Sequence, residues 1–514
     1  MFIAFLNPQG NFDPNDSYWT MHPDFGGQLV YVKEVSLALA GWGHRVDIVT
    51  RQIVDPDWPE FAAPLDVYPG HENVRIVRIP FGGDRFLLKE ELWPYLGTEF
   101  APRIIGFYRQ EGRFPDAITA HYADGGLTAA VLQEETDISF TFTPHSLGAQ
   151  KMEKLGAMWD NLAELDARFH FARRITAERI AMSRASVCTA STAQERFEQY
   201  AHPAYQGAID VHDDQRLVVI PPGVNLQVFD KEARSVVEQA TRAKVQARLA
   251  RDIAPGRREL PVIIASSRLD VKKNHVGLVR AFAGSQELQQ KANLLLITRG
   301  LDNPLADYSP SIPPAGGGDE RGGEGTREVL DQIMAVVDEG GLRGKISLFS
   351  LDSQDELAAA YRFLAERRSV FALTTYYEPF GLAPLEAMAA GLPVVVTRNG
   401  GPAESLREGD EEYGVLVDPF DPADIARGLL LVLDDEATWQ RYAEAGRRRV
   451  HDRYTWESTA RKFEQILLGL TSDPPHPPHP GGLPIHPYFL RPAPENDIPL
   501  EKLAELYFKG AGTL

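Results

Sequence analysis

The sequence predicts an α/β protein with two Rossmann-like domains that face an interdomain cleft. Short runs rich in β-branched residues alternate with helical patterns from one end of the chain to the other. Many runs are apolar on both faces, for example Val262–Ala265 and Val394–Val396, which is typical of parallel strands covered by helices. At 514 residues the chain is too long for one hydrophobic core, and two domains fit it better.

Thirteen candidate strands succeed one another along the chain. They cover residues 2–6, 45–50, 73–79, 117–121, 139–143, 186–191, 217–220, 262–266, 293–298, 346–350, 370–374, 393–397 and 414–417. A single sheet of this width would be unusual, which favours two sheets. We place the first domain at residues 1–218, completed by 455–514, and the second at 219–454. The Pro-Pro-Gly sequence within residues 220–224 predicts a stiff hinge between them.

Three further segments interrupt this alternation. Residues 309–326 are rich in glycine and proline and predict a mobile loop inserted in the second domain. Residues 472–487 favour a polyproline linker, with a metal-binding tract as the alternative. The histidines of this segment are His476, His479 and His486. Residues 498–508 have the pattern of a short amphipathic terminal helix.

Composition narrows the class of protein. The content of 43% hydrophobic and 24% charged residues is typical of a globular protein. A net charge of −19 argues against nucleic acid or an anionic membrane as a partner. The one cysteine, Cys188, cannot form an intrachain disulfide and lies in an apolar run that predicts burial. Residues 1–6 read as a strand and not as a signal peptide, and no apolar stretch is long enough for a bilayer, so we expect a cytoplasmic protein.

The segment from Tyr376 to Glu386 is the most informative part of the chain. It joins a predicted buried strand to a helix expected to begin near Pro384, through a turn that contains glycine. Such a connection presents backbone N–H groups to a phosphate. Glu378 is expected in the turn, and Glu386 in the first helical turn, where its charge would complement the helix dipole. An ordinary connection with two solvated acids is the alternative.

A basic pair follows the predicted strand 262–266. Arg268 and Lys273 stand five residues apart across a strand-to-helix turn and can approach one anion from two sides. A bidentate arginine with a point-charge lysine suits a diphosphate. Positive charge at a helix start opposes the local dipole, which favours a functional role over a surface turn.

Two motifs in the first half also follow predicted strands. Gly26 and Gly27 open a helical pattern after the first strand and allow close backbone approach to a ligand, with a turn that binds no ligand as the alternative. His145 follows the strand 139–143 and can donate or accept a hydrogen bond, with a structural histidine as the alternative. Neighbouring Arg173 and Arg174 cannot both face one direction on a helix.

Several other motifs are missing or weak. The glycine pair does not match the dinucleotide fingerprint, and there is no P-loop, zinc-protease motif or cysteine ligand pair. Asp55 and Asp57 resemble a metal-binding pair, but an ordinary turn is the better interpretation. On spacing alone, Lys89 is a surface lysine.

Taken together, these motifs resemble the retaining nucleotide-sugar glycosyltransferases of family four, and within them the subgroup that makes sucrose 6-phosphate. The resemblance covers nearly the whole chain and rests on five segments. These are Phe5–Asp13, His22–Gln28, His145–Lys151, Arg268–Asn274 and Glu378–Glu386. It implies transfer of glucose from UDP-glucose, or from ADP-glucose, to fructose 6-phosphate, with release of UDP or ADP. UDP-glucose would be a substrate, no cofactor would be obligatory, and Mg²⁺ would at most stimulate.

The resemblance also implies roles for single residues. Glu386 is similar to the acid that binds the nucleotide ribose, Glu378 to the acid facing the donor hexose, and His145 to a residue that contacts the glucosyl ring. Arg268 and Lys273 are similar to the pair that neutralises the diphosphate. Other donor-side positions are Gly27 and the N–H groups of Phe380, Gly381 and Leu382. The acceptor-side positions are Gly26, Gln28, Lys89, Lys151, Arg173 and Arg174.

The chain departs from the family in two ways. Pro144 stands where the family has glycine before the histidine, which fixes φ and removes an N–H. Residues 471–514 are too few for the phosphatase domain fused to some relatives, so a separate phosphatase would remove the phosphate.

Other functions remain open. Sucrose synthase would use free fructose, and mannosylfructose-phosphate synthase would use GDP-mannose. Two acids also suit a retaining glycosidase, but the Arg-Lys pair argues against a neutral substrate. A catalytically idle sugar-nucleotide regulator is a third class. Retention by front-face attack is favoured over a covalent double displacement.

Overall fold

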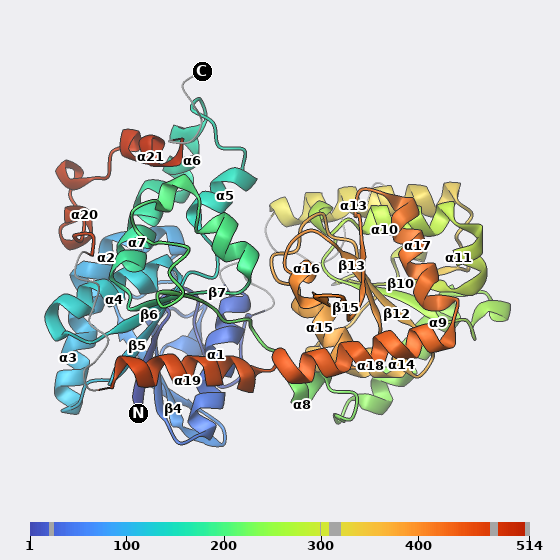
Figure 1. Cartoon of the computed structure of the whole chain (residues 1–514), viewed down its shortest axis with the longest axis horizontal. Helices are drawn as coiled ribbons and strands as arrows, with labels where there is room; N and C mark the ends of the chain where they lie inside the picture. The colour runs from blue at the N-terminus through green and yellow to red at the C-terminus, as the bar shows by residue number, and fades with distance from the viewer. Residues whose placement is uncertain (20–24, 299, 308–319, 473–481, 509–514) are drawn as a thin grey trace. The chain divides into compact units, whose positions relative to one another are not determined.

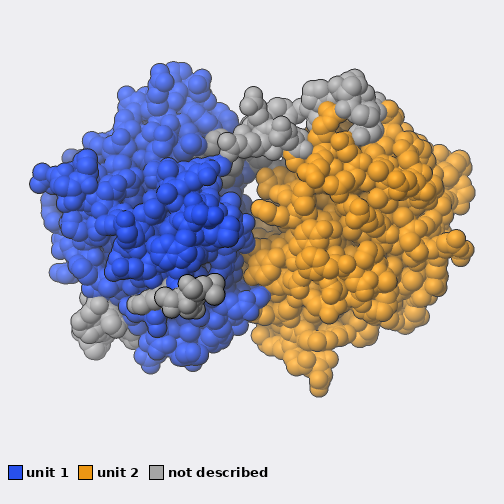
Figure 2. All heavy atoms as spheres, turned by 90° about the horizontal axis from the view of Figure 1, so that it is seen from above, with its two compact units in different colours: residues 1–221, 459–514 blue, residues 222–458 orange. Residues whose placement is uncertain are grey.

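A computed structural model describes residues 1–19, 25–298, 300–307, 320–472 and 482–508. The chain forms two compact units, coloured separately in Figure 2: unit 1 is residues 1–221 and 459–514, and unit 2 is residues 222–458. The sequence predicts boundaries at 218/219 and 454/455. The chain returns from unit 2 to unit 1 within the long helix α19 (Trp456–Leu470), drawn in orange-red in Figure 1.

Unit 1 contains a sheet with the order β3-β4-β2-β1-β5-β6-β7-β8. Its strands are β1 (Phe2–Leu6), β2 (Arg45–Gln52), β3 (Leu65–Tyr68), β4 (His71–Pro80), β5 (Ala117–His121), β6 (Phe140–Thr143), β7 (Val187–Ala190) and β8 (Leu217–Val219). All neighbours pair in parallel except β3 and β4, which are antiparallel. The strand order reverses between β1 and β5, where a doubly wound sheet binds ligands.

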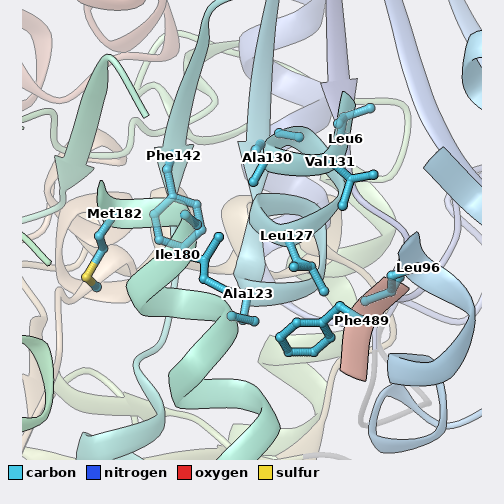
Figure 3. Close-up of a cluster of buried hydrophobic side chains, with 14 of the residues drawn as sticks. Leu6, Leu96, Ala123, Leu127, Ala130, Val131, Phe142, Ile180, Met182 and Phe489 are labelled. Atoms are coloured by element: carbon cyan, nitrogen blue, oxygen red, sulfur yellow. The ribbon is translucent and has the colours of Figure 1, made fainter. Parts of the chain in front are cut away.

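Helices pack against both the sheet and one another in unit 1. They are α1 (Gly27–Gly41), α2 (Trp93–Tyr95), α3 (Ala101–Glu111), α4 (Tyr122–Thr136), α5 (Gly148–Lys154), α6 (Leu162–Phe169), α7 (Phe171–Arg184), α20 (Pro487–Leu490) and α21 (Leu500–Tyr507). Figure 3 shows the core that they enclose, where Leu127 of α4 lies among side chains from α7, the sheet and the C-terminal segment. Phe489 of α20 lies beside Leu96 there, so the C-terminal segment belongs to the core of unit 1.

Unit 2 contains a parallel sheet with the order β11-β10-β9-β12-β13-β16. Its strands are β9 (Val262–Ser266), β10 (Asn293–Thr298), β11 (Ile346–Ser350), β12 (Val370–Leu373), β13 (Val394–Thr397) and β16 (Val415–Val417). This is the Rossmann order 3-2-1-4-5-6, with the reversal between β9 and β12. The predicted fold class of two Rossmann-like domains is therefore confirmed.

The helices of unit 2 are α8 (Leu226–Phe229), α9 (Glu238–Asp252), α10 (His275–Gly284), α11 (Gln286–Lys291), α12 (Pro304–Asp307), α13 (Glu320–Glu339), α14 (Gln354–Ala365), α15 (Leu382–Ala389), α16 (Pro402–Ser405), α17 (Pro422–Leu433) and α18 (Glu436–Arg453). The predicted loop 309–326 is wrong from residue 320 onward, because α13 begins there. Residues 309–319 lie outside the described residues.

All thirteen predicted strands are present, but three observed strands were not predicted. These are β3 and the paired two-residue strands β14 (Arg407–Glu408) and β15 (Glu411–Glu412). Each is short and largely exposed, so its sequence lacks the apolar run that marks a buried strand. The predicted terminal helix is confirmed as α21. His476 and His479 lie outside the described residues, whereas His486 caps α20 by accepting a hydrogen bond from the Tyr488 N–H.

Candidate active site

In unit 2, two predicted site residues meet at the sheet reversal. Lys273 follows β9 and Glu378 follows the neighbouring strand β12. The Lys273 Nζ donates a hydrogen bond to the Glu378 Oε2 at 3.0 Å, and both side chains are partly exposed. The two residues are 105 positions apart in sequence, so the parallel pairing of β9 and β12 is what brings them together.

Arg268 lies in the same loop as Lys273 but takes no part in the ion pair between Lys273 and Glu378. Its side chain is exposed, and within the described ranges the guanidinium has no hydrogen bond or ion pair. The Arg268 carbonyl accepts a hydrogen bond from the His275 Nε2 at 3.2 Å, and this nitrogen also contacts the Ser267 Oγ at 2.8 Å. The backbone of Arg268 is thus anchored while its guanidinium remains available to an anion.

Asn274 joins the loop after β9 to the loop after β12. Its side-chain Nδ2 donates to the carbonyls of Thr374, at 3.0 Å, and Pro419, at 2.8 Å. Its Oδ1 accepts from the Gly277 N–H, which caps α10, and its φ of 52° is left-handed. We did not predict this residue, although asparagine before a helix start is a known signal for such a cap.

The predicted glycine-containing turn is present between β12 and α15. Gly381 is the N-cap with a φ of 96°, and Leu382 begins the helix. Two glycines after β13 pack against this loop. A Cβ on Gly400 would lie 2.0 Å from the Glu378 carbonyl oxygen, and one on Gly401 would lie 2.6 Å from the Phe380 Cα. These glycines were missed, although they directly follow a predicted strand.

The predicted position of Glu386 in the first turn of the helix is wrong. The helix begins at Leu382, two residues before Pro384, because proline is tolerated in a first turn, and that turn contains no acid. Glu386 therefore lies one turn further on and does not meet the helix dipole at its start. It is half-buried, and burial raises the pKa of its carboxyl group to about 7.

In unit 1, the glycine pair lies where we predicted, at the start of a helix. Gly26 is the N-cap of α1 with an extended φ of −136°, and Gly27 is exposed as the first helical residue. Gln28 follows in the first turn, and its side-chain Oε1 would lie 2.9 Å from a Cβ on Gly26. The preceding residues 20–24 lie outside the described residues.

His145 lies after β6 in a tight turn. Its φ is 55°, and the Ser146 N–H donates to the Pro144 carbonyl at 2.6 Å. The imidazole is half-buried, and its Nε2 lies 2.9 Å from the Nδ1 of His121, at the end of β5. Burial lowers the pKa of His145 to about 3, so the ring is neutral at physiological pH.

Three of the predicted acceptor-side cations gather near the ends of β5 and β6. Lys151 forms an ion pair of 3.6 Å with Glu90. Burial lowers the pKa of Lys151 to about 8, and the positive charges of Arg174 and Lys89 contribute to this shift to a smaller extent. Arg174 is buried, donates to the Glu178 carboxylate at 2.9 Å and lies over the Tyr122 ring.

Arg173 does not join this cluster. Its guanidinium donates to the Asp497 carboxylate at 3.2 Å and lies over the ring of Tyr488, so it faces the C-terminal segment. The prediction that adjacent arginines face different ways is confirmed, and the structure shows which one lies beside Lys151.

Asp124 is a buried acid that we did not predict. It lies in the first turn of α4, directly after β5, and its Oδ1 accepts from the Gly125 N–H at 2.8 Å. Burial raises the pKa of its carboxyl group to about 7, against the charges of Arg174 and Lys89. The rule that ligands bind after strand ends, applied to 117–121, would have found it.

The described residues contain no group of three or more His, Cys, Asp or Glu side chains arranged to hold a metal ion. Asp55 is part of an ordinary turn, as predicted, because its carboxylate accepts from the N–H groups of Asp57 and Phe86. Among the described helices, none has the length and apolar character needed to cross a bilayer. Cys188 is buried, also as predicted.

Comparison with known proteins places this geometry in a family. Residues 2–231 match the model of the first GT-B domain of sucrose synthase, and residues 250–449 match that of the group 1 glycosyl transferases. A probable sucrose-phosphate synthase of Thermosipho melanesiensis is 40% identical over 91% of this chain and 96% of its own length. The chain belongs to the sucrose-phosphate synthase family.

Two further sucrose-phosphate synthases extend the comparison. Probable sucrose-phosphate synthase 2 of Arabidopsis thaliana is 31% identical, and the match covers 90% of this chain but only 47% of the plant protein. The solved sucrose-phosphate synthase of Thermosynechococcus elongatus aligns with a TM-score of 0.63 and 25% identity, over 91% of this chain and 98% of that one. The protein is thus a glycosyltransferase of sucrose-phosphate synthesis, and its family uses nucleotide-sugar and sugar-phosphate substrates.

Proposed function

We propose that the protein transfers glucose from UDP-glucose to O2 of fructose 6-phosphate and releases sucrose 6-phosphate and UDP. One observation supports this most: each unit has its own cationic group at the carboxyl ends of its central strands. Unit 2 has Arg268 and Lys273, and unit 1 has Lys89, Lys151 and Arg174. A reaction with phosphate on both substrates needs two separate groups of this kind.

On the donor side, we assign the diphosphate to Arg268 and Lys273. The available guanidinium of Arg268 suits a bidentate contact, and Lys273 is held in place by Glu378. The N–H groups of Phe380, Gly381 and Leu382 would bind phosphate oxygens at the start of α15. Glu386 would accept bonds from the ribose hydroxyls, and Glu378 would face the glucosyl ring.

On the acceptor side, we assign the 6-phosphate to Lys89, Lys151 and Arg174, with Gly26 and Gln28 contacting the ketose. Lys151 is partly exposed and its partner Glu90 lies at 3.6 Å, a weak pair that a phosphate can replace. Arg174 is held by Glu178 and Ser146 and would act as a fixed charge. Arg173 has no part in this assignment.

We propose front-face attack with retention. The bond between the anomeric carbon and the diphosphate oxygen breaks, the fructose O2 bonds to that carbon, and its proton passes to the departing phosphate oxygen. The positive charges of Arg268 and Lys273 stabilise the charge that develops on UDP, so no obligatory metal is invoked. A separate phosphatase would then release sucrose. Cytoplasmic location stays a prediction.

The test is UDP release by purified protein given UDP-glucose with either fructose 6-phosphate or fructose. We expect fructose 6-phosphate to be used with a kcat/KM at least about tenfold higher, the size of one charge-assisted hydrogen bond. Equal values would remove the phosphate assignment and favour sucrose synthase. Parallel reactions with ADP-glucose and GDP-mannose test the donor, and GDP-mannose as the better donor would favour mannosylfructose-phosphate synthase.

A further inference from the structure

Behind His145, a chain of three side chains runs into the core of unit 1. The His145 Nε2 lies 2.9 Å from the His121 Nδ1, and the His121 Nε2 lies 2.7 Å from the Thr119 Oγ1. Thr119 and His121 both lie on β5, two residues apart, and both are fully buried. Neither Thr119 nor His121 has a role in the function proposed above.

The rings of this chain are fixed on several sides. His121 stacks on Phe5 of β1 with an interplanar angle of 8°, and its plane is tilted by 24° from that of His145, at a centroid distance of 5.1 Å. Tyr31 of α1 meets the His145 ring edge to face at 5.1 Å. The geometry therefore allows little rotation of either imidazole, and each nitrogen keeps its neighbour.

Both imidazoles are neutral, because burial lowers the pKa of each below its ordinary value. Each ring then has one N–H donor and one acceptor nitrogen. Which group donates in each of these hydrogen bonds is decided at the buried end of the series, at Thr119. Among the described residues, the Thr119 Oγ1 has His121 as its only hydrogen-bond partner, side chain or backbone. If the hydroxyl accepted from His121, its own proton would be buried without an acceptor.

A buried donor without a partner is rarer and less favourable than an acceptor with a spare lone pair. The Thr119 hydroxyl should therefore donate to the His121 Nε2. The His121 proton is then on Nδ1 and donates to the His145 Nε2. The remaining proton of His145 must be on its Nδ1, the nitrogen that has no hydrogen bond to the described residues.

We propose that Thr119 and His121 are positioning residues that hold His145 as a neutral Nδ1–H donor. His145 then recognises an oxygen that accepts a hydrogen bond, and does not serve as an acid or base. That this oxygen belongs to the glucosyl group rests on the function proposed above. The tautomer itself depends only on the contacts in unit 1.

The direct test is ¹⁵N NMR of the full chain labelled at histidine, with His145 and His121 assigned from His145→Gln and His121→Asn. We expect a protonated Nδ1 and an unprotonated Nε2 for His145, unchanged across neutral pH. A protonated Nε2 on His145 would overturn the proposal. This result is independent of turnover, so it can contradict the proposed tautomer of His145 without contradicting the proposed function, and the reverse.

Matched variants of Thr119 test whether its hydroxyl group sets the tautomer of His145. Thr119→Val keeps the shape and removes the hydroxyl, whereas Thr119→Ser keeps a hydroxyl donor. In Thr119→Val we expect a second His145 tautomer in the spectrum and a kcat lowered by roughly two- to tenfold, as for loss of one neutral hydrogen bond. Thr119→Ser should restore the single tautomer. Identical spectra for the two variants would contradict a role for the hydroxyl.

His121 gives a second, independent pair. The amide of His121→Asn can donate to the His145 Nε2 from nearly the position of the lost Nδ1, whereas His121→Leu cannot. We expect His121→Asn to keep the Nδ1–H form of His145 and His121→Leu to lose it. If both variants retain the wild-type His145 signals, His121 does not position His145 and the proposal fails.

Discussion

The two units use the same sheet geometry but arrange their charges differently. In unit 2, Arg268 and Lys273 lie in one exposed loop, and Lys273 pairs with an acid from the next strand-end loop. In unit 1, Arg174 is buried with Glu178, and Lys151 lies under the influence of other cations. A short motif can encode the first arrangement, whereas the second needs several distant segments to pack together.

The largest effect should come from the exposed loop of unit 2. We expect Lys273→Ala to lower kcat by two or more orders of magnitude, since one fixed donor to a developing charge is typically worth about 2.7–4 kcal/mol. UDP release measures turnover, and thermal unfolding checks the fold. Lys272→Ala is the matched control, because Lys272 is an exposed neighbour in the same turn. Equal losses in both variants would contradict the assignment.

The next effect separates two cations of unit 1, because Lys151 lies in the acceptor-side cluster and Arg173 faces the C-terminal segment. We expect Lys151→Ala to raise the KM for fructose 6-phosphate by about tenfold or more, the size of one charge-assisted hydrogen bond, with less change for fructose. Arg173→Ala should leave both KM values within about twofold, because surface ion pairs such as that with Asp497 contribute little. An effect of Arg173→Ala as large as that of Lys151→Ala would reverse the assignment.

The smallest effect compares one acid from each unit whose pKa is raised by burial. Burial raises the pKa of Asp124 and of Glu386 to about 7. Such a group stabilises the folded state while protonated. Its contribution is complete below the unfolded pKa near 4 and is lost as the pH rises through about 7. We therefore expect the free energy of unfolding to fall over this range.

Asp124→Asn and Glu386→Gln should each remove part of that decrease. Urea unfolding of wild type and both variants at about pH 5 and about pH 8 measures it, because the slope of stability with pH reports the difference in bound protons. Variants whose stability changes with pH in parallel with wild type would show that these acids do not titrate as proposed.

Much of the fold could be predicted because burial leaves a direct trace in sequence. Strands such as β10 and β13 are buried throughout, and their apolar runs mark them. The strand β3 escaped prediction because three of its four residues are at least partly exposed. Glu386 was wrongly expected in the first turn of α15, because proline is compatible with a first helical turn and the helix begins two residues before Pro384.

By itself, the sequence determined the two Rossmann-like sheets, the loops after their strands and the identity of the charged residues in those loops, since these depend on local patterns. Only the tertiary structure decided which of those residues meet. The pairing of β9 with β12 brings Lys273 to Glu378. Packing in unit 1 places Arg174, and not Arg173, beside Lys151. It also brings His121 within hydrogen-bond distance of His145. Contacts between distant segments are set by packing, which no short stretch of sequence records.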